Sequence, residues 1–313
     1  IKDKTMIKPK RLNPGSTIGI ISPSYWIDNH ILEQASKIFS DRNYKLVFGK
    51  TIHSKKGPFA GSAKIRAEDI HTMFLDPSID AIVCARGGYG ANKVIPLLNY
   101  ELIKNHPKIF IGYSDITAYL ISITQRTKLI TFHGPMLTTY KYGFEEYSYN
   151  QMINILSGKK KIDVLSSNKI KPHILKQGTA VGPLWGGNLT LVINRLGTND
   201  QINTNNSILF LEDLNEYYFS FERMLIHLQK AGVFDNIKGL IIGELINMKD
   251  EDVPFGKTID EIVMDICGEK DFPIVTNFPC GHGTHQATLP ISLPVELKAE
   301  SDLSIKLLEP AVQ

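Results

Sequence analysis

Short apolar runs alternate with stretches of helical periodicity in the first half of the chain. Five runs are short and rich in β-branched residues, which is typical of buried parallel strands: residues 17–22, 45–48, 81–85, 109–111 and 130–133. Between them, the pattern predicts helices over about 28–41, 62–76 and 91–98, and a further helix from 116. Strands that alternate with helices favour an α/β fold with a parallel, doubly wound sheet.

The pattern changes over residues 157–178, which are rich in Lys, Ser and Asn and predict a connection between domains. Strands and helices then resume, with strands predicted over 207–211, 239–245 and 273–278 and helices over 217–232 and 258–267. The tail, 289–297, alternates like strands of a small antiparallel or barrel-like sheet. We therefore expect an N-terminal domain over 1–160, a linker over 161–178 and a C-terminal domain over 179–313.

The composition is that of an ordinary globular protein, with 42% hydrophobic and 21% charged residues among 313. The net charge of +3 is small and the basic residues are dispersed, so nothing indicates a nucleic-acid or membrane surface. The three consecutive lysines at 159–161 are most simply part of a solvated loop. Three cysteines argue against a disulfide framework, and no signal peptide is evident, so we expect a cytoplasmic protein.

Ser114 lies where the strand over 109–111 runs through Gly112 into the helix from 116. This turn is expected at the carboxyl edge of the sheet, where ligands usually bind. The Ser114 hydroxyl would stand at the strand end, and the first free N–H groups of the helix, beginning with Asp115, would face a developing negative charge. This favours a nucleophile elbow, although Ser and Asp are also the commonest helix caps.

A glycine-rich loop, Arg86-Gly87-Gly88-Tyr89-Gly90, follows the strand over 81–85 and is expected at the same edge. Its glycines would let backbone amides approach a ligand closely. The loop is a candidate arm of an oxyanion hole, with Arg86 able to bind a carboxylate. The alternative is a tight turn between strand and helix.

Glu212 and His282 each follow a predicted strand of the second half. A carboxylate at the end of an apolar strand is costly unless paired, so Glu212 is a candidate to orient a catalytic histidine or a member of a structural ion pair. His282 stands between glycines and could reach across a cleft as a base, or have a purely structural role.

Two alternatives remain open around His282. Cys280, His282 and His285 could be zinc ligands, although their spacing is unlike that of common structural sites. Cys280 could also act as a nucleophile with His282, although residues two apart at a strand end tend to diverge. We expect no metal and no cofactor.

Taken together, a Ser, a Glu, a His and a loop of free amides supply every role of serine hydrolysis. In this order they resemble the LD-carboxypeptidase family of serine peptidases, and the match runs nearly end to end. The stretches that carry the resemblance are Gly19–Ser24, Ala60–Ser62, Ala85–Gly90, Ile111–Thr117, Phe132–Met136, Gly186–Leu189, Leu211–Asp213, Gly281–Gly283 and Leu289–Ile291.

The resemblance implies a triad of Ser114, Glu212 and His282, and an oxyanion hole from the amides of Gly88 and Asp115. Substrate-binding residues are expected at Arg86, Gly87 and Asn188. It also implies a flavodoxin-like N-terminal domain with helices on both faces of its sheet, and a smaller β-rich α/β C-terminal domain, often in a homodimer. The implied activity is metal-free release of terminal D-alanine from murein tetrapeptide in cytoplasmic cell-wall recycling.

One branch of this family, the microcin-immunity proteins, hydrolyses peptidyl-nucleotides instead. Because the chain keeps Arg86-Gly87-Gly88-Tyr89-Gly90 and Gly281-His282-Gly283, it is more similar to the cell-wall branch, although Thr284-His285-Gln286 is a less usual continuation. A non-catalytic module that holds a peptide or phosphate in the same cleft is the alternative from another class.

Overall fold

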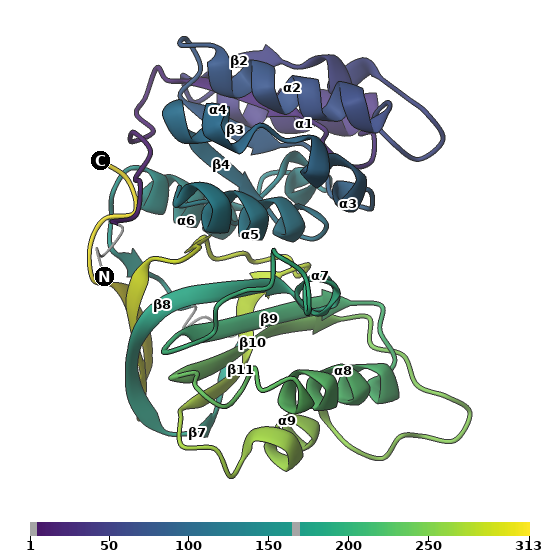
Figure 1. The fold of residues 1–313 in the computed structure, drawn as a ribbon, viewed down its shortest axis with the longest axis vertical. Helices are drawn as coiled ribbons and strands as arrows, with labels where there is room; N and C mark the ends of the chain where they lie inside the picture. Colours follow the sequence, from purple (N-terminus) through teal and green to yellow (C-terminus); the bar gives the residue numbers. More distant parts are fainter. Residues whose placement is uncertain (1–4, 165–169) are drawn as a thin grey trace.

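The computed structural model describes residues 5–164 and 170–313. The first half forms a six-stranded sheet in the order β12-β5-β4-β3-β1-β2 (Figure 1). Its strands are β1 (Thr17–Ile21), β2 (Lys45–Phe48), β3 (Ala81–Cys84), β4 (Ile109–Gly112), β5 (Phe132–His133) and β12 (Leu289–Pro290). The first five are parallel. Their order is that of a flavodoxin-like sheet, which confirms the predicted fold class.

Helices cover both faces of this sheet, as is typical of a doubly wound sheet whose strand order reverses at β1. They are α1 (Asn29–Ser40), α2 (Ala63–Leu75), α3 (Ala91–Val94), α4 (Tyr100–Asn105), α5 (Ile116–Thr127) and α6 (Glu146–Leu156), with short 3-10 turns at Lys50–His53, Ile95–Leu97 and Leu137–Tyr140. The side chains of Asp28 and Ser62 cap α1 and α2. The single helix predicted over 91–98 is a four-residue α-helix followed by a 3-10 turn, because Pro96 cannot continue an α-helix.

The second half forms an eight-stranded sheet in the order β6-β14-β13-β8-β9-β10-β11-β7. The strands are β6 (Lys161–Ile162), β7 (His173–Lys176), β8 (Gly178–Asn188), β9 (Ile208–Leu214), β10 (Gly239–Ile246), β11 (Ile274–Gly281), β13 (Pro294–Ala299) and β14 (Leu303–Leu307). The four central strands are parallel, and the outer ones are antiparallel. Its helices are α7 (Leu189–Asn194), α8 (Tyr218–Lys230) and α9 (Ile259–Cys267).

The structure differs from the predicted pattern in two places. The tail does not form a separate small sheet: β13 and β14 extend the large second sheet, and β12 pairs with β5 of the first. The stretch over 161–178, expected to be a linker, contributes β6 and β7 to the second sheet, while residues 165–169 lie outside the described residues. Ile162 is fully buried, and the burial of this apolar side chain stabilises β6 although the neighbouring residues are polar. The domain boundaries stay a prediction.

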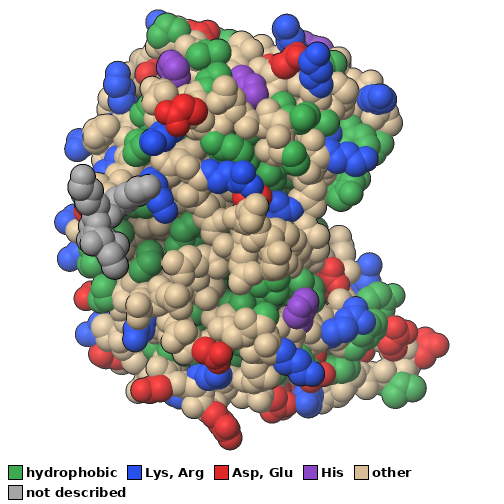
Figure 2. Space-filling view, in the orientation of Figure 1, with side chains coloured by type: hydrophobic (Ala, Val, Ile, Leu, Met, Phe, Trp, Pro, Cys, Tyr) green, Lys and Arg blue, Asp and Glu red, His purple; other side chains and the backbone are tan. Residues whose placement is uncertain are grey.

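The two halves meet along α5, which contacts β8 and α7. At this junction the backbone N–H of Asn188 donates to Thr117 Oγ1 at 3.1 Å, and Arg126 pairs with Asp200 at 2.7 Å. Since β8 ends and α5 begins here, the junction brings the carboxyl ends of both sets of parallel strands together. Figure 2 shows basic and acidic side chains interspersed over the face in view. No helix in the described part of the chain has the length and apolar character needed to cross a membrane.

Candidate active site

Ser114 lies on a sharp turn between β4 and α5. Its φ of 62° is in the left-handed region, which a residue with a side chain adopts only at a cost of roughly 1 kcal/mol or more. The turn is held by the following helix, where the N–H of Thr117 donates to the carbonyl of Ser114 at 2.9 Å. The backbone therefore raises the Ser114 side chain above the sheet edge into the cleft.

The glycine-rich loop after β3 lies directly against Ser114. A Cβ on Gly87 would lie 2.9 Å from the Cβ of Ser114 and 3.1 Å from its Oγ, so only glycine lets the two backbones approach this closely. Gly88 has a φ of 114°, and a Cβ there would meet the ring of Tyr25. The close approach places the amide of Gly88 beside the elbow.

The side chain of Asp115 ties this loop to the elbow. Its carboxylate accepts hydrogen bonds from Ser24 Oγ at 2.5 Å and from the N–H of Ala91 at 3.0 Å, so it points away from the cleft. Burial raises the pKa of Asp115, and these hydrogen bonds oppose that effect. Within residues 5–164 and 170–313, the N–H groups of Gly88 and Asp115 donate no hydrogen bond, so both are available to a ligand.

Glu212 and His282 form a close pair across the second sheet. Glu212 lies near the end of β9 and is fully buried, and His282 follows β11. His282 Nδ1 is 2.7 Å from Glu212 Oε2, and the ring of Tyr113 packs edge-on against the imidazole at 5.0 Å. The pairing leaves the other ring nitrogen, Nε2, available to the cleft.

Glu212 and His282 each stabilise the charged form of the other. Burial alone raises the pKa of Glu212, but His282 and His133 together bring it down to about 2. Burial works to lower the pKa of His282, yet the charge and hydrogen bond of Glu212 raise it above its usual value. A buried carboxylate that stays ionised beside an imidazole is the arrangement that stabilises an imidazolium during proton transfer.

One cleft of about 720 Å³ brings these groups together. It is lined by residues of both halves, among them Arg86, Gly87, Gly88, Ser114, Lys141 and His282. Arg86 donates to the carbonyl of Trp26 at 3.0 Å and lies over the ring of Tyr25. The cleft thus brings together Ser114, His282 and the first three residues of the glycine loop. Glu212 lies behind His282, and Asp115 follows Ser114 without lining the cleft itself.

Asn188 does not join them. It is 3% exposed, and its side chain caps α7 and donates to Asp213 at 2.9 Å. Since both ends of the amide are used within the fold, the structure gives Asn188 a supporting position rather than one that faces a substrate.

The three side chains of the alternative zinc site are directed to different partners. Cys280 is fully buried and burial raises its pKa well above the usual range, so neither a metal-binding nor a nucleophilic thiolate is favoured. His282 holds Glu212, and His285 lies 3.6 Å from Glu145. Among the described residues no group of three such side chains is placed to hold a metal ion.

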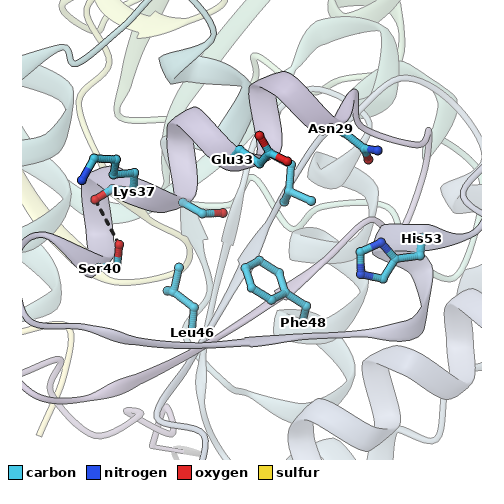
Figure 3. A pocket seen from close by; sticks show the side chains of 9 residues that line it. Asn29, Glu33, Lys37, Ser40, Leu46, Phe48 and His53 are labelled. Atoms are coloured by element: carbon cyan, nitrogen blue, oxygen red, sulfur yellow. Dashed lines mark hydrogen bonds between the residues drawn. The ribbon is translucent and has the colours of Figure 1, made fainter.

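A second pocket, of about 570 Å³, lies between α1 and the edge strand β2 (Figure 3). Figure 3 shows Asn29, Glu33, Lys37 and Ser40 on the helix beside Leu46 and Phe48 of the strand, with His53 nearby. The pocket contains a histidine and a carboxylate but no elbow or free amide pair, so it offers no comparable chemistry.

Two residues that sequence reasoning did not single out lie at the site. Lys141 lines the cleft, on a segment between the 3-10 turn Leu137–Tyr140 and α6, a helix that the sequence did not predict. His133, at the end of β5, is buried with its Nε2 3.6 Å from Glu212 Oε1. The signals in the sequence were the position of His133 at a strand end and its place in the stretch Phe132–Met136, one of those that carry the resemblance.

A serine on an elbow, an ionised glutamate behind a histidine, and two free amides at one cleft of an α/β fold are together typical of a serine peptidase. Comparison with known families agrees. Residues 18–134 match the LD-carboxypeptidase N-terminal domain and residues 181–297 match the LD-carboxypeptidase C-terminal domain. The chain belongs to the LD-carboxypeptidase family, and a carboxypeptidase role follows.

The relatives of this chain include proteins named as carboxypeptidases and proteins named for microcin immunity. The probable murein peptide carboxypeptidase of Bacillus subtilis is 32% identical over 91% of this chain and 89% of its own. The microcin C7 self-immunity protein MccF of Escherichia coli is 27% identical over 90% of each chain, and its ligand-free structure matches with a TM-score of 0.90, covering 98% of this chain and all of that one. The muramoyltetrapeptide carboxypeptidase of Oxalobacter formigenes, at 23% identity, shares the fold with a TM-score of 0.84 over 93% of this chain and 98% of its own.

Proposed function

We propose that this protein is a serine LD-carboxypeptidase that hydrolyses the L-D peptide bond of murein tetrapeptide and releases the terminal D-alanine. The observation that carries the proposal is the meeting of the Ser114 elbow with the His282–Glu212 pair at one cleft beside Arg86. The relative named as a probable murein peptide carboxypeptidase supports the choice of substrate.

In the proposed mechanism, Ser114 Oγ attacks the carbonyl carbon of the scissile bond while His282 Nε2 takes the hydroxyl proton. Glu212, held to Nδ1 at 2.7 Å, fixes the tautomer and stabilises the imidazolium. The N–H groups of Gly88 and Asp115 bind the oxyanion of the tetrahedral intermediate, each contributing on the order of 3 kcal/mol. His282 then gives its proton to the leaving amine of D-alanine, and water hydrolyses the acyl-enzyme by the same steps.

Arg86 supplies the exopeptidase specificity in this proposal. The leaving group is one amino acid with a free carboxylate, so a cation is required just beyond the scissile bond. Arg86 is two residues from the proposed oxyanion amide of Gly88 and lines the same cleft. Its guanidinium can bind a carboxylate with two parallel N–H bonds, which selects orientation as well as charge.

Hydrolysis of a peptidyl-nucleotide is the second candidate, because the likeness to the MccF structure extends over nearly the whole chain. The motif Arg86-Gly87-Gly88-Tyr89-Gly90 favours the murein substrate over it. We also propose a cytoplasmic homodimer, on the basis of the family resemblance and the three cysteines.

The test is hydrolysis by the purified full chain of murein tetrapeptide, the same peptide amidated at its C-terminus, and an aspartyl sulfamoyl adenosine. We expect stoichiometric D-alanine and tripeptide from the free acid and much slower turnover of the amide. Preferred cleavage of the nucleoside would assign the chain to the immunity branch. Retention of intact tetrapeptide without turnover of any substrate would leave the binding module as the function.

A further inference from the structure

His133 occupies a central position that the proposed mechanism does not use. It ends β5, which lies between β4, whose end leads to Ser114, and β12, which follows the His282 loop. In the register of the sheet His133 is opposite Gly112 on one side and Leu289 on the other. The histidine therefore lies between the strand of the nucleophile and the segment of the base.

Its imidazole approaches the carboxylate oxygen of Glu212 that His282 does not hold. His133 Nε2 is 3.6 Å from Glu212 Oε1, while His282 Nδ1 is 2.7 Å from Oε2. His133 is 1% exposed, and its ring packs edge-on against Tyr113 and Phe210 at 6.2 Å and 5.2 Å.

The facing atoms have no other partner. Within the described residues, neither ring nitrogen of His133 nor Oε1 of Glu212 makes a hydrogen bond. Buried polar atoms without partners are rare because each costs about 1–3 kcal/mol. A small closing movement between Nε2 and Oε1, now 3.6 Å apart, would satisfy both atoms at once.

We propose that His133 is a positioning residue that holds Oε1 of Glu212, so that Oε2 stays aligned with His282. The inference rests on the proposed serine-peptidase function of this site. With its proton on Nε2, His133 donates to the carboxylate and prevents it from rotating away from His282. Glu212 is thereby held between two imidazoles, one that acts in proton transfer and one that fixes the carboxylate.

The contact of His133 with Glu212 should also lower the pKa of His282, the proposed base. A donor on Oε1 withdraws charge from the carboxylate and so weakens its hold on the His282 proton. Without that donor, Glu212 is more basic and the pKa of His282 rises. Besides the pair itself, the titratable groups that face it from the surrounding elements are Asp213, Glu244, Cys280, Lys141 and Tyr113.

Two amide substitutions that differ by one methylene test the proposal. His133→Gln can place its amide nitrogen near the position of Nε2 and keep the donor, whereas His133→Asn is too short to reach Oε1. We expect His133→Asn to lower kcat about 30-fold with KM within about twofold. The acid limb of its kcat/KM profile should move upward by about half a pH unit, since His282 must be neutral to act as base. His133→Gln should stay within about threefold of the unsubstituted protein and keep its acid limb.

Equal loss in both variants, with unchanged acid limbs, would show a packing role and overturn the proposal. A second measurement needs no substitution and no substrate: nitrogen-15 NMR of the histidines in the intact protein should show a slowly exchanging proton on Nε2 of His133. A His133 protonated only on Nδ1 would also overturn it. If the intact protein hydrolyses no murein peptide, the proposed function fails, whereas the NMR result and the pH dependence of Ser114 labelling by a fluorophosphonate still decide the role of His133.

Discussion

The two sides of the cleft are built by different forces. The elbow region, which comprises Gly87, Gly88, Ser114 and Asp115, is set by backbone geometry: close approach of two chains, positive φ angles and free N–H groups. The acid–base region, which comprises Glu212, Glu244 and the loop 281–283, is set by carboxylates that the fold buries. Forming the elbow region costs free energy because its backbone is strained. Forming the acid–base region costs free energy because charged groups are removed from water.

The glycines on either side of His282 show this difference most clearly. A Cβ on Gly281 would lie 2.5 Å from Oε2 of Glu212, and one on Gly283 would overlap the carboxyl of Glu244. These glycines make room for acidic side chains, whereas Gly87 makes room for the nucleophile itself. The acid–base region should therefore respond to pH more strongly than the elbow region, where the carboxylate of Asp115 points away from the cleft.

The largest effect should come from the elbow region. Ser114→Ala removes the nucleophile and should lower kcat by about four to six powers of ten, because the other groups of a triad contribute little without it. The fold should persist, since the backbone turn is unchanged. Turnover of murein tetrapeptide and circular dichroism measure the two properties, and activity near that of the unsubstituted protein would remove Ser114 from the mechanism.

The next effect should come from the acid–base region. Glu212→Gln should lower kcat by about three to four powers of ten, because the neutral amide no longer stabilises the imidazolium. Burial then acts on His282 without the compensating charge, so the pKa of His282 falls and the acid limb of the kcat/KM profile moves to lower pH.

The same variant tests the stability of this region. The pKa of Glu212 is about 2 in the folded protein against a usual 4.5, so its ionised form stabilises the fold above about pH 4.5. That contribution is lost as pH falls from 4.5 toward 2. Urea unfolding across this window should show a steeper loss of stability in the unsubstituted protein than in Glu212→Gln, and parallel curves would contradict the assigned ionisation.

Arg86 adds a charged side chain to the elbow region. Replacing it tests whether the backbone groups of this region are sufficient to recognise the substrate, or whether the guanidinium is also needed. Arg86→Lys keeps the charge and loses the bidentate fork, and we expect kcat/KM for the free-acid tetrapeptide to fall about tenfold. The C-terminally amidated peptide should be poor for both proteins and nearly insensitive to the change. A variant that folds normally and still discriminates acid from amide would show that another residue, such as Lys141, reads the carboxylate.

The smallest effect concerns Glu244. Burial raises its pKa to about 7 from a usual 4.5, so the folded state favours the neutral acid. The stability this provides is present below pH 4.5 and is lost as pH rises to about 7. Glu244→Gln stays neutral, so it should exceed the unsubstituted protein in free energy of unfolding by about 1 kcal/mol at pH 8, since partial exposure screens the charge. At pH 4 the two proteins should unfold alike, and a difference there would point to packing instead.

Much of the elbow region could be predicted because its determinants are local. Ser114 follows its strand and precedes its helix within a few residues, and the Gly87-Gly88 pair follows another strand of the same parallel sheet. Parallel strands share a carboxyl edge, so two loops far apart in sequence could be expected to meet. Asn188 shows the limit: the motif around it suggested substrate contact, but a cap and a buried hydrogen bond to Asp213 occupy its amide.

The sequence by itself determined most of the strands and helices and the parallel first sheet, because apolar periodicity and glycine-bearing turns act over short distances. The family and its flavodoxin-like fold followed from the resemblance of whole motifs. Only the tertiary structure decided how β12 returns to the first sheet, how Glu212 meets a histidine 70 residues away, and how His133 reaches the same carboxylate from the other half. Burial and pairing of charges depend on which distant segments exclude water together, and no local pattern encodes that.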